Sequence, residues 1–219
     1  MTKNQKLTTL YIVRHAQTQA NVRELLQGQS DSPLTKEGRI QIKNLKKELR
    51  NIHFDAFFSS DLLRARRTAE IIALERKMAV ITTKALRERN FGRLEGKKYE
   101  IFSTELRHLF EKYQGLSHEK KLKFRFVNDM ESDEEILMRF ITFLREISVA
   151  YAGKTLLIVT HGAMIRILLI HLGVGSYDDF IAIPNTAYIK LASDGVDFFI
   201  KGGKGVKKTP NEPSIRRQV

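Results

Sequence analysis

The chain has 219 residues, with 38 lysines and arginines against 25 acidic residues, so its formal net charge at pH 7 is +13. Hydrophobic residues make up 42% and charged residues 29%, which is typical of one globular domain with an insertion and excludes general disorder or a coiled coil. Cysteine is absent, which excludes disulfides and a cysteine nucleophile, and the positive charge indicates anionic partners: phosphorylated metabolites, nucleic acid or a membrane surface.

Strand-like and helix-like segments alternate along the chain. The β-rich run Leu7–Val13 comes first, and apolar residues at helical spacing predict a helix over Lys36–Asn51 with Thr35 as its N-cap. Ser132 followed by Glu135 is a capping box, which predicts the start of another helix. The other strands are expected at Ala56–Phe58, Val80–Thr82, Thr155–Thr160, Tyr188–Leu191 and Val196–Ile200, and the other helices at Leu62–Leu74, Lys98–Tyr113 and Ala163–Leu172.

This alternation predicts an α/β fold, a three-layer sandwich with a mainly parallel sheet and helices on both faces. The continuously apolar run Leu156–Val159 is typical of a central strand covered on both sides. We expect a single domain over residues 1–200, with residues 97–131, which are more basic and less periodic, as a cap insertion. Residues 201–219 form a basic C-terminal tail that we expect to be loose.

No segment has the pattern of a membrane span or a targeting signal. The most apolar stretch, residues 155–172, carries His161, Arg166 and His171, each of which is costly in lipid. The apolar run Leu10–Val13 is too short for the core of a signal peptide. We therefore expect a cytoplasmic protein that does not bind membranes.

Two of the predicted strands end in the same way. One runs into Arg14 and His15, and the other runs through Thr160 into His161. Ligands of open α/β sheets bind at the carboxyl ends of the strands. At the same edge, the strand expected at Ala56–Phe58 leads into the helix that carries Arg64. The sequence therefore predicts two imidazoles and two guanidiniums at one edge of the sheet.

This set of side chains suits phosphoryl transfer. A neutral imidazole is a competent nucleophile near pH 7, and guanidiniums bind phosphate oxygens with paired donors while staying charged. A single histidine after a strand is more often structural, so the prediction depends on the combination. The other histidines follow no such pattern and are expected to be solvated or to lie on helix faces: His53, His108, His118 and His171. No histidine pair has the spacing of metal ligands on a helix, so we expect no metal.

The strand ends belong to longer motifs that resemble the histidine phosphatase superfamily, in its phosphoglycerate-mutase-like branch. The motifs are LYIVRHAQTQAN at Leu10–Asn21, QG at Gln27–Gly28, SPLTKEG at Ser32–Gly38, SSDLLRARRTAE at Ser59–Glu70, LRERNFGRLEG at Leu86–Gly96 and VTHGAMIR at Val159–Arg166.

The resemblance implies a role for each motif residue and no cofactor. His15 corresponds to the nucleophile that becomes phosphohistidine, and Glu88 to the proton donor for the leaving oxygen. By itself Glu88, between two arginines, has the pattern of a surface ion pair, although an alkoxide leaving group does need a proton. The phosphate is expected to be held by Arg14, Asn21, Arg64, His161 and Gly162.

Two positions depart from the family pattern. Ala16 stands where glycine is usual after the nucleophile, which is tolerable if its φ is negative. Gln17 stands where glutamate is frequent, and we expect it to make the mouth of the pocket less acidic. Neither change removes a catalytic group.

Three functions fit these residues. The first is a phosphatase for a small phosphomonoester, and the second is a 2,3-bisphosphoglycerate-dependent phosphoglycerate mutase, which needs the same catalytic residues. The segment Leu94–Tyr99 favours the phosphatase, as does the basic run Lys120–Lys123, which we expect to be flexible and unsuited to a closed lid. The third is a non-catalytic binder of polyanions, but the charge is dispersed and no specific nucleic-acid motif is present. A homodimer is one option for its assembly.

Overall fold

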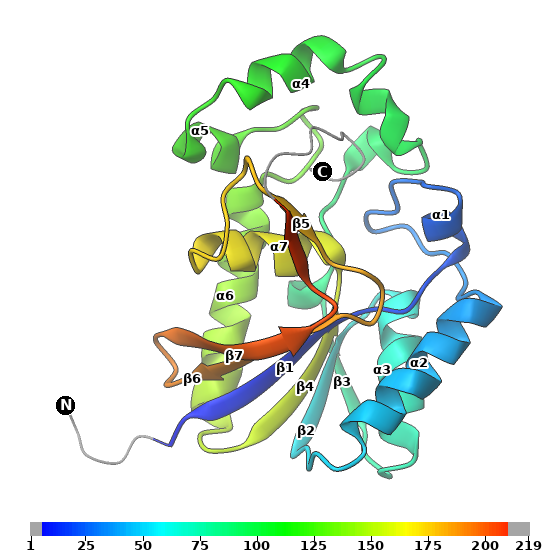
Figure 1. The fold of residues 1–219 in the computed structure, drawn as a ribbon, viewed down its shortest axis with the longest axis vertical. Coiled ribbons are helices and arrows are strands. Elements are labelled where there is room, and N and C mark those ends of the chain that lie inside the picture. The colour runs from blue at the N-terminus through cyan, green and yellow to red at the C-terminus, as the bar shows by residue number, and fades with distance from the viewer. Residues whose placement is uncertain (1–5, 210–219) are drawn as a thin grey trace.

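A six-stranded sheet in the order β3-β2-β4-β1-β6-β7 forms the centre of the protein (Figure 1). The structure is a computed structural model that describes residues 6–209. The strands of this sheet are β1 (Thr8–Arg14), β2 (Ala56–Ser60), β3 (Val80–Thr83), β4 (Thr155–Thr160), β6 (Tyr188–Ser193) and β7 (Phe198–Lys204). The first four pair in parallel and the last two add antiparallel, so the predicted mainly parallel sheet is confirmed.

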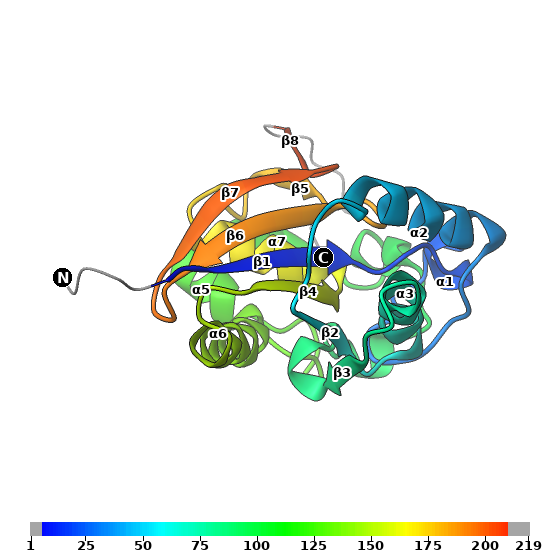
Figure 2. The same cartoon turned by 90° about the horizontal axis from the view of Figure 1, so that it is seen from below.

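The helices of the sandwich are α2 (Lys36–Leu49), α3 (Leu63–Leu74), α6 (Asp133–Ala150) and α7 (Gly162–His171). Alternate residues of β1 point to opposite faces of the sheet, with Leu10 and Ile12 in the core beneath α6 and α7, and Tyr11 and Val13 in the core beneath α2 and α3. Figure 2 shows the sheet between α6 and the α2–α3 pair. The predicted three-layer sandwich with helices on both faces is therefore confirmed.

Local side-chain chemistry sets where two of these helices begin. The Thr35 side chain accepts a hydrogen bond from the Gly38 backbone and caps α2. Ser132 and Glu135 form the predicted capping box at the start of α6.

Residues 97–131 lie above the sandwich, where α4 (Arg107–Gln114) and α5 (His118–Lys123) form a layer at the top of Figure 1. The predicted continuous helix over Lys98–Tyr113 is wrong. Only the short 3-10 helix η3 (Tyr99–Phe102) and α4 are helical there, because the hydroxyls of Ser103 and Thr104 both donate to the Glu100 carbonyl and compete with the helical pattern.

The basic run Lys120–Lys123 is not flexible as predicted but belongs to helix α5. Lys121 is 5% exposed, and its Nζ donates to Asp178 at 2.7 Å and lies 5.6 Å from the centre of the Tyr113 ring. The alkyl stem of the lysine packs into the cap while its charge is paired, which the sequence spacing did not reveal.

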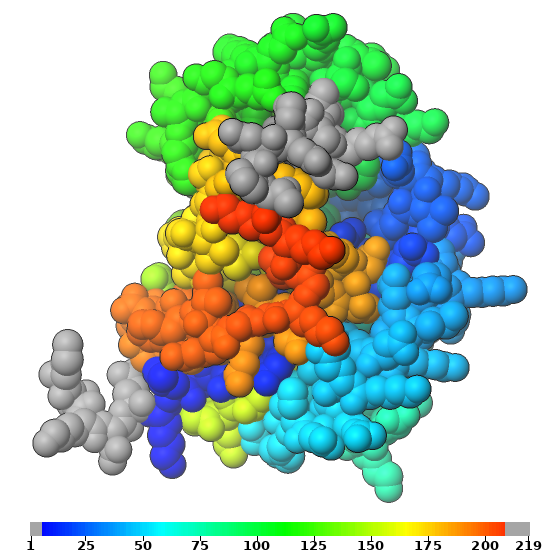
Figure 3. Space-filling model, viewed as in Figure 1, coloured from blue at the N-terminus to red at the C-terminus, as the bar shows by residue number. Residues whose placement is uncertain are grey.

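The basic tail is not loose over its first nine residues. Strand β7 continues to Lys204, and β8 (Lys207–Thr209) pairs antiparallel with β5 (Phe180–Ala182). Figure 3 shows this orange-to-red segment packed across one face of the molecule. Residues 210–219 lie outside the described part of the chain.

The remaining short elements connect these layers. They are α1 (Gln19–Val22), η1 (Lys84–Leu86) and η2 (Gly92–Leu94).

Among the described residues no helix is long and apolar enough to cross a membrane.

Candidate active site

The carboxyl ends of β1 and β4 bring the two strand-end histidines together. These strands are parallel neighbours in which Arg14 is paired with Thr160, and the His15 backbone donates to the Thr160 carbonyl at 2.9 Å. The ring centroids of His15 and His161 are consequently only 5.1 Å apart. The predicted gathering of imidazoles at one edge of the sheet is what the structure shows.

His15 is held as a neutral imidazole with one nitrogen directed by the backbone. Its Nδ1 lies 2.8 Å from the Ala16 carbonyl oxygen. Because a carbonyl only accepts, Nδ1 carries the proton and Nε2 keeps its lone pair. Burial lowers the pKa of His15 well below its ordinary 6.5, and the charges of Arg64 and Arg14 lower it further. The ring therefore has the protonation state of a nucleophile.

Arg14 crosses the N-terminus of α7 beside Gly162. Its Nη1 donates to the Ile183 carbonyl, and its buried Nε has no hydrogen-bond partner within residues 6–209. A Cβ on Gly162 would lie 3.4 Å from this Nε, at the short end of ordinary van der Waals contact. Glycine at this position therefore lets the guanidinium lie close to the helix end, where backbone N–H groups also bind anions.

Arg64 is 1% exposed and is held by the loop that precedes α2. Its Nη1 donates to the Ser30 carbonyl at 2.7 Å and its Nη2 to the Gly28 carbonyl at 2.6 Å. Gly28 has φ +52°, and a Cβ there would lie 2.0 Å from a Glu95 oxygen, so only glycine fits. The Arg64 Nε is left buried without a partner in the described structure.

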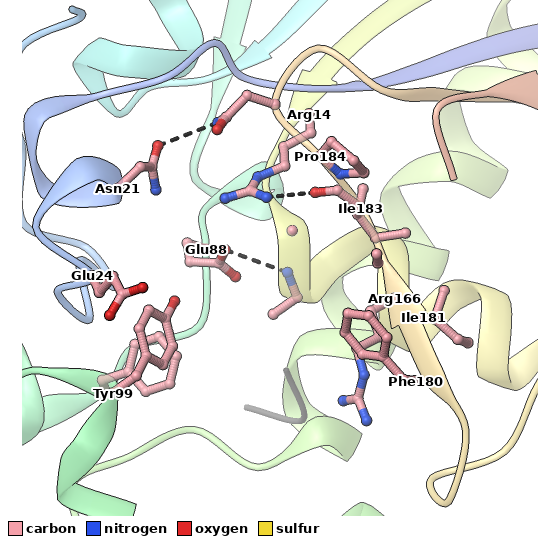
Figure 4. Close-up of a pocket in the computed structure, with 15 residues that line it drawn as sticks. Arg14, Asn21, Glu24, Glu88, Tyr99, Arg166, Phe180, Ile181, Ile183 and Pro184 are labelled. Atoms are coloured by element: carbon pink, nitrogen blue, oxygen red, sulfur yellow. Dashed lines mark hydrogen bonds between the residues drawn. The ribbon is translucent and has the colours of Figure 1, made fainter. Parts of the chain in front are cut away.

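His161 and Asn21 complete the set expected to hold a phosphate. His161 is fully buried as the N-cap residue of α7, and neither ring nitrogen has a hydrogen-bond partner among the described residues. The Asn21 Oδ1 accepts from the Thr18 backbone at 3.1 Å and from the Asn185 amide at 3.2 Å. The Asn21 amide nitrogen is thereby turned toward the pocket (Figure 4).

Glu88 lines the same pocket as Arg14 and Asn21 (Figure 4). Its Oε1 accepts from the Arg89 backbone at 2.9 Å, and its Oε2 accepts from the Ala163 backbone at 3.4 Å. The surface ion pair that its neighbours alone would predict is absent among the described residues.

Arg139 fixes the backbone that carries Glu88. Its Nη1 donates to the Ala85 and Arg87 carbonyls at 2.9 and 2.7 Å. Its Nη2 donates to the Glu88 carbonyl at 3.1 Å and also bonds Glu131. An arginine inside α6 thus positions the carboxylate on a distant loop.

Some of these residues line one cavity of about 370 Å³. Arg14, Asn21, Glu88 and Gly162 lie along one part of its wall, and residues around Ile181 form another. His15, Arg64 and His161 do not line the cavity: they are buried, and His15 and His161 directly adjoin the lining residues Arg14 and Gly162 in the sequence. A cavity with Arg14, Asn21 and Glu88 in its wall, next to two buried imidazoles, fits the transfer of a phosphoryl group.

The sequence did not single out Asn185, Arg139 or Ile183. Asn185 donates to the His15 carbonyl at 3.0 Å as well as to Asn21, so it ties the nucleophile to the C-terminal wall. A distant asparagine, arginine or backbone carbonyl leaves no spacing pattern relative to His15. Only the Asn185 neighbour Pro184, which indicates a turn there, was a local signal.

The two departures from the family pattern have structural explanations. Ala16 is not among the described residues with positive φ, so its methyl group suits the backbone. Gln17 does not line the cavity, contrary to the expected effect on the pocket mouth. Its Oε1 instead accepts from the Thr35 hydroxyl at 2.8 Å, at the start of α2. Within the described residues no cluster of three metal-ligating side chains is present.

The fold and this arrangement of side chains are those of a phosphoryl-transfer enzyme. The family model of the histidine phosphatase superfamily (branch 1) matches residues 10–202. The chain therefore belongs to the histidine phosphatase superfamily.

Similar proteins include both phosphatases and a mutase. The chain is 30% identical over 192 residues to a Bacillus subtilis protein named "Uncharacterized phosphatase PhoE", covering 88% of this chain and 89% of that one. The structure resembles a phosphoglycerate mutase from Bacillus anthracis with a TM-score of 0.75 and 27% identity, covering 90% of this chain and 93% of the other. It also shares the fold of a phosphoserine phosphatase from Entamoeba histolytica solved with phosphoserine (TM-score 0.76, 22% identity, covering 90% and 97%).

Proposed function

We propose that the protein hydrolyses a small phosphomonoester through a phosphohistidine on His15. The observation that carries this proposal is the His15 ring itself, whose Nδ1 is bonded to the Ala16 carbonyl and whose neutral form is favoured by burial. A buried histidine with a purely structural role has no need for unpaired guanidinium and imidazole N–H groups around it.

In the first step the His15 Nε2 attacks the phosphorus, and an N–P bond forms as the P–O bond to the leaving group breaks. Arg14, Arg64 and His161, with the Asn21 amide, donate to the equatorial oxygens, where negative charge accumulates. Glu88 gives its proton to the leaving oxygen, so the product departs as an alcohol.

In the second step a water molecule attacks the phosphohistidine. Glu88, now a carboxylate, takes a proton from the water, the N–P bond breaks, and inorganic phosphate leaves. His15 returns to the neutral form, which its surroundings favour. The hydrogen bonds from the Arg89 and Ala163 backbones keep the carboxylate oriented during both steps.

The test is to trap the intermediate. Enzyme mixed with labelled substrate and quenched in alkali should carry an acid-labile phosphate on His15. His15→Ala should lose kcat by several orders of magnitude, whereas His53→Ala, which changes an exposed histidine far from the site, should retain it. Full turnover by His15→Ala would refute the proposal.

A phosphoglycerate mutase is the second candidate, and the ordered cap favours it more than the sequence did. Helices α4 and α5 form a packed layer in place of the expected flexible run, with Lys121 buried in it. Both reactions share the phosphohistidine, so we would follow 3-phosphoglycerate with and without 2,3-bisphosphoglycerate. Release of inorganic phosphate without the bisphosphate supports the phosphatase, and bisphosphate-dependent formation of 2-phosphoglycerate supports the mutase.

The cytoplasmic location, the homodimer and the lack of specific nucleic-acid or membrane partners stay predictions from the sequence, as does the division at residue 200. A small phosphorylated substrate fits a cavity of about 370 Å³.

A further inference from the structure

Two arginines are buried near Tyr113 of the cap, and one of them, Arg166, lines the cavity. Arg89 is 6% exposed and Arg166, on α7, is 7% exposed. They are close enough for each to disfavour the charge of the other, although burial is the main reason that the pKa of Arg89 is lowered. The proposed reaction uses neither guanidinium.

Among residues 6–209, one buried carboxylate forms an ion pair with this pair of arginines. The Arg89 Nη2 donates to Asp133, the first residue of α6. Arg166 forms no ion pair with a described residue; its side chain is hydrogen-bonded to that of Tyr113 and its guanidinium lies 6.0 Å from the centre of the Tyr177 ring. Its Nε and Nη2 are buried without a hydrogen-bond partner among residues 6–209. A buried charge without an ion-pair partner is costly, so these two free N–H-bearing nitrogens favour the binding of an anion.

Arg166 lines the same cavity as the proposed phosphate site. Figure 4 shows its guanidinium directed away from Arg14 and Glu88, at the opposite end of the pocket. Gly162 and Arg166 are four residues apart on α7, which corresponds to ~6 Å along the helix axis. Phe91 and Ile181 line the wall as well, so the cavity combines two guanidiniums with apolar surface.

We propose that the substrate carries a second anionic group, a carboxylate or a second phosphate, which binds Arg166 while its scissile phosphate faces His15. This inference rests on the proposed function, because it needs His15 to mark the reacting end. Arg166 is then a substrate-binding residue that selects phosphomonoesters with two anions. A fork of N–H groups suits either kind of anion.

The test uses substrate pairs that differ in the second anion. Phosphoserine and phosphoethanolamine differ by one carboxylate, and fructose 1,6-bisphosphate and fructose 6-phosphate differ by one phosphate. In one of the two pairs, we expect the wild type to have at least tenfold higher kcat/KM for the member with two anions. The pair that shows this preference identifies the second anion as a carboxylate or a phosphate. Arg166→Met should reduce this ratio by about 10–100-fold, as expected for the loss of a charge-assisted contact. Arg166→Lys, which keeps the charge, should reduce it less.

A matched control is Arg107→Met, which removes an exposed arginine of α4 and should leave the ratio unchanged. Dissociation constants measured by calorimetry for the same pairs give the preference for the member with two anions from binding alone, independently of the rate of hydrolysis. If neither pair shows a preference, or if Arg166→Met retains it, the inference is wrong. Hydrolysis of p-nitrophenyl phosphate by the wild type and by His15→Ala is measured in parallel. If the wild type does not hydrolyse it, or if His15→Ala hydrolyses it equally well, the proposed function is refuted. The ratio of dissociation constants within each substrate pair would still test the role of Arg166.

Discussion

Replacement of Glu88 by glutamine tests the proposed chemistry through the leaving group. An alkyl alkoxide needs a proton to depart, whereas nitrophenolate departs without one. The glutamine amide has nearly the same shape but cannot supply the proton. General acid catalysis contributes roughly 10²–10⁴-fold, or about 3–5 kcal/mol, and this loss should fall on alkyl phosphates only.

The structure predicts a smaller loss shared by both kinds of substrate. Glu88 accepts from two backbone N–H groups, at 2.9 Å from Arg89 and 3.4 Å from Ala163. Glutamine has one carbonyl oxygen, so it keeps the shorter bond and loses the longer one. One hydrogen bond contributes about 1 kcal/mol, which corresponds to roughly fivefold in rate. Glu88→Gln should therefore lower kcat/KM about fivefold on p-nitrophenyl phosphate and by a further 10²–10⁴-fold on glycerol 3-phosphate.

The assay compares kcat/KM for these two substrates in the wild type and in two variants. Glu95→Gln is the matched control, because Glu95 also accepts from backbone N–H groups, those of Gln29 and Ser30, but does not line the cavity. That variant should affect both substrates equally. Equal losses in Glu88→Gln would show that Glu88 only supports the loop, and would refute its assignment as the acid.

Other predictions concern positioning, pH and stability. Arg139→Lys removes the guanidinium N–H groups that donate to the backbone carbonyls around Glu88. It should therefore lower kcat at least tenfold for glycerol 3-phosphate and by less for p-nitrophenyl phosphate. Equal losses for the two substrates would contradict a role of Arg139 in positioning Glu88. Burial holds the pKa values of His15 and His161 well below 6.5, so the acid limb of kcat/KM should lie below pH 6.5. Below pH 6.5 the histidines of the unfolded chain bind protons, whereas His15 and His161 of the folded chain do not. Calorimetry should therefore show that Tm falls as the pH decreases below 6.5. A Tm that rises instead would contradict the burial of these histidines as neutral groups. Arg166→Met removes a buried charge that has no ion-pair partner among residues 6–209 and should leave Tm unchanged or raise it. A drop of more than a few degrees would show that its hydrogen bond to Tyr113 stabilises the fold by more than its burial costs. Addition of a chelator should leave the phosphatase activity unchanged in a phosphate-release assay.

The sequence alone determined the layers of the fold and the location of the site. The continuous apolar run at residues 155–160 required a strand covered on both faces, and the caps at Thr35 and Ser132 set the starts of α2 and α6. His15 and His161 each follow such a strand directly, so a parallel sheet necessarily brings them to one edge. Signals of this kind lie within a few neighbouring residues, where hydrogen-bonding and apolar spacing act without long-range contacts.

The tertiary structure decided what distant parts of the chain contribute to that edge. Arg139 reaches the Glu88 loop from α6, and Asn185 binds the His15 carbonyl across 170 residues of sequence. Lys121 is buried because Asp178 pairs with its charge, which a basic run by itself does not predict. The unpaired state of Arg166 depends on which side chains of the cap and of α7 pack together. These contacts form only when long loops close, and local spacing carries no record of them.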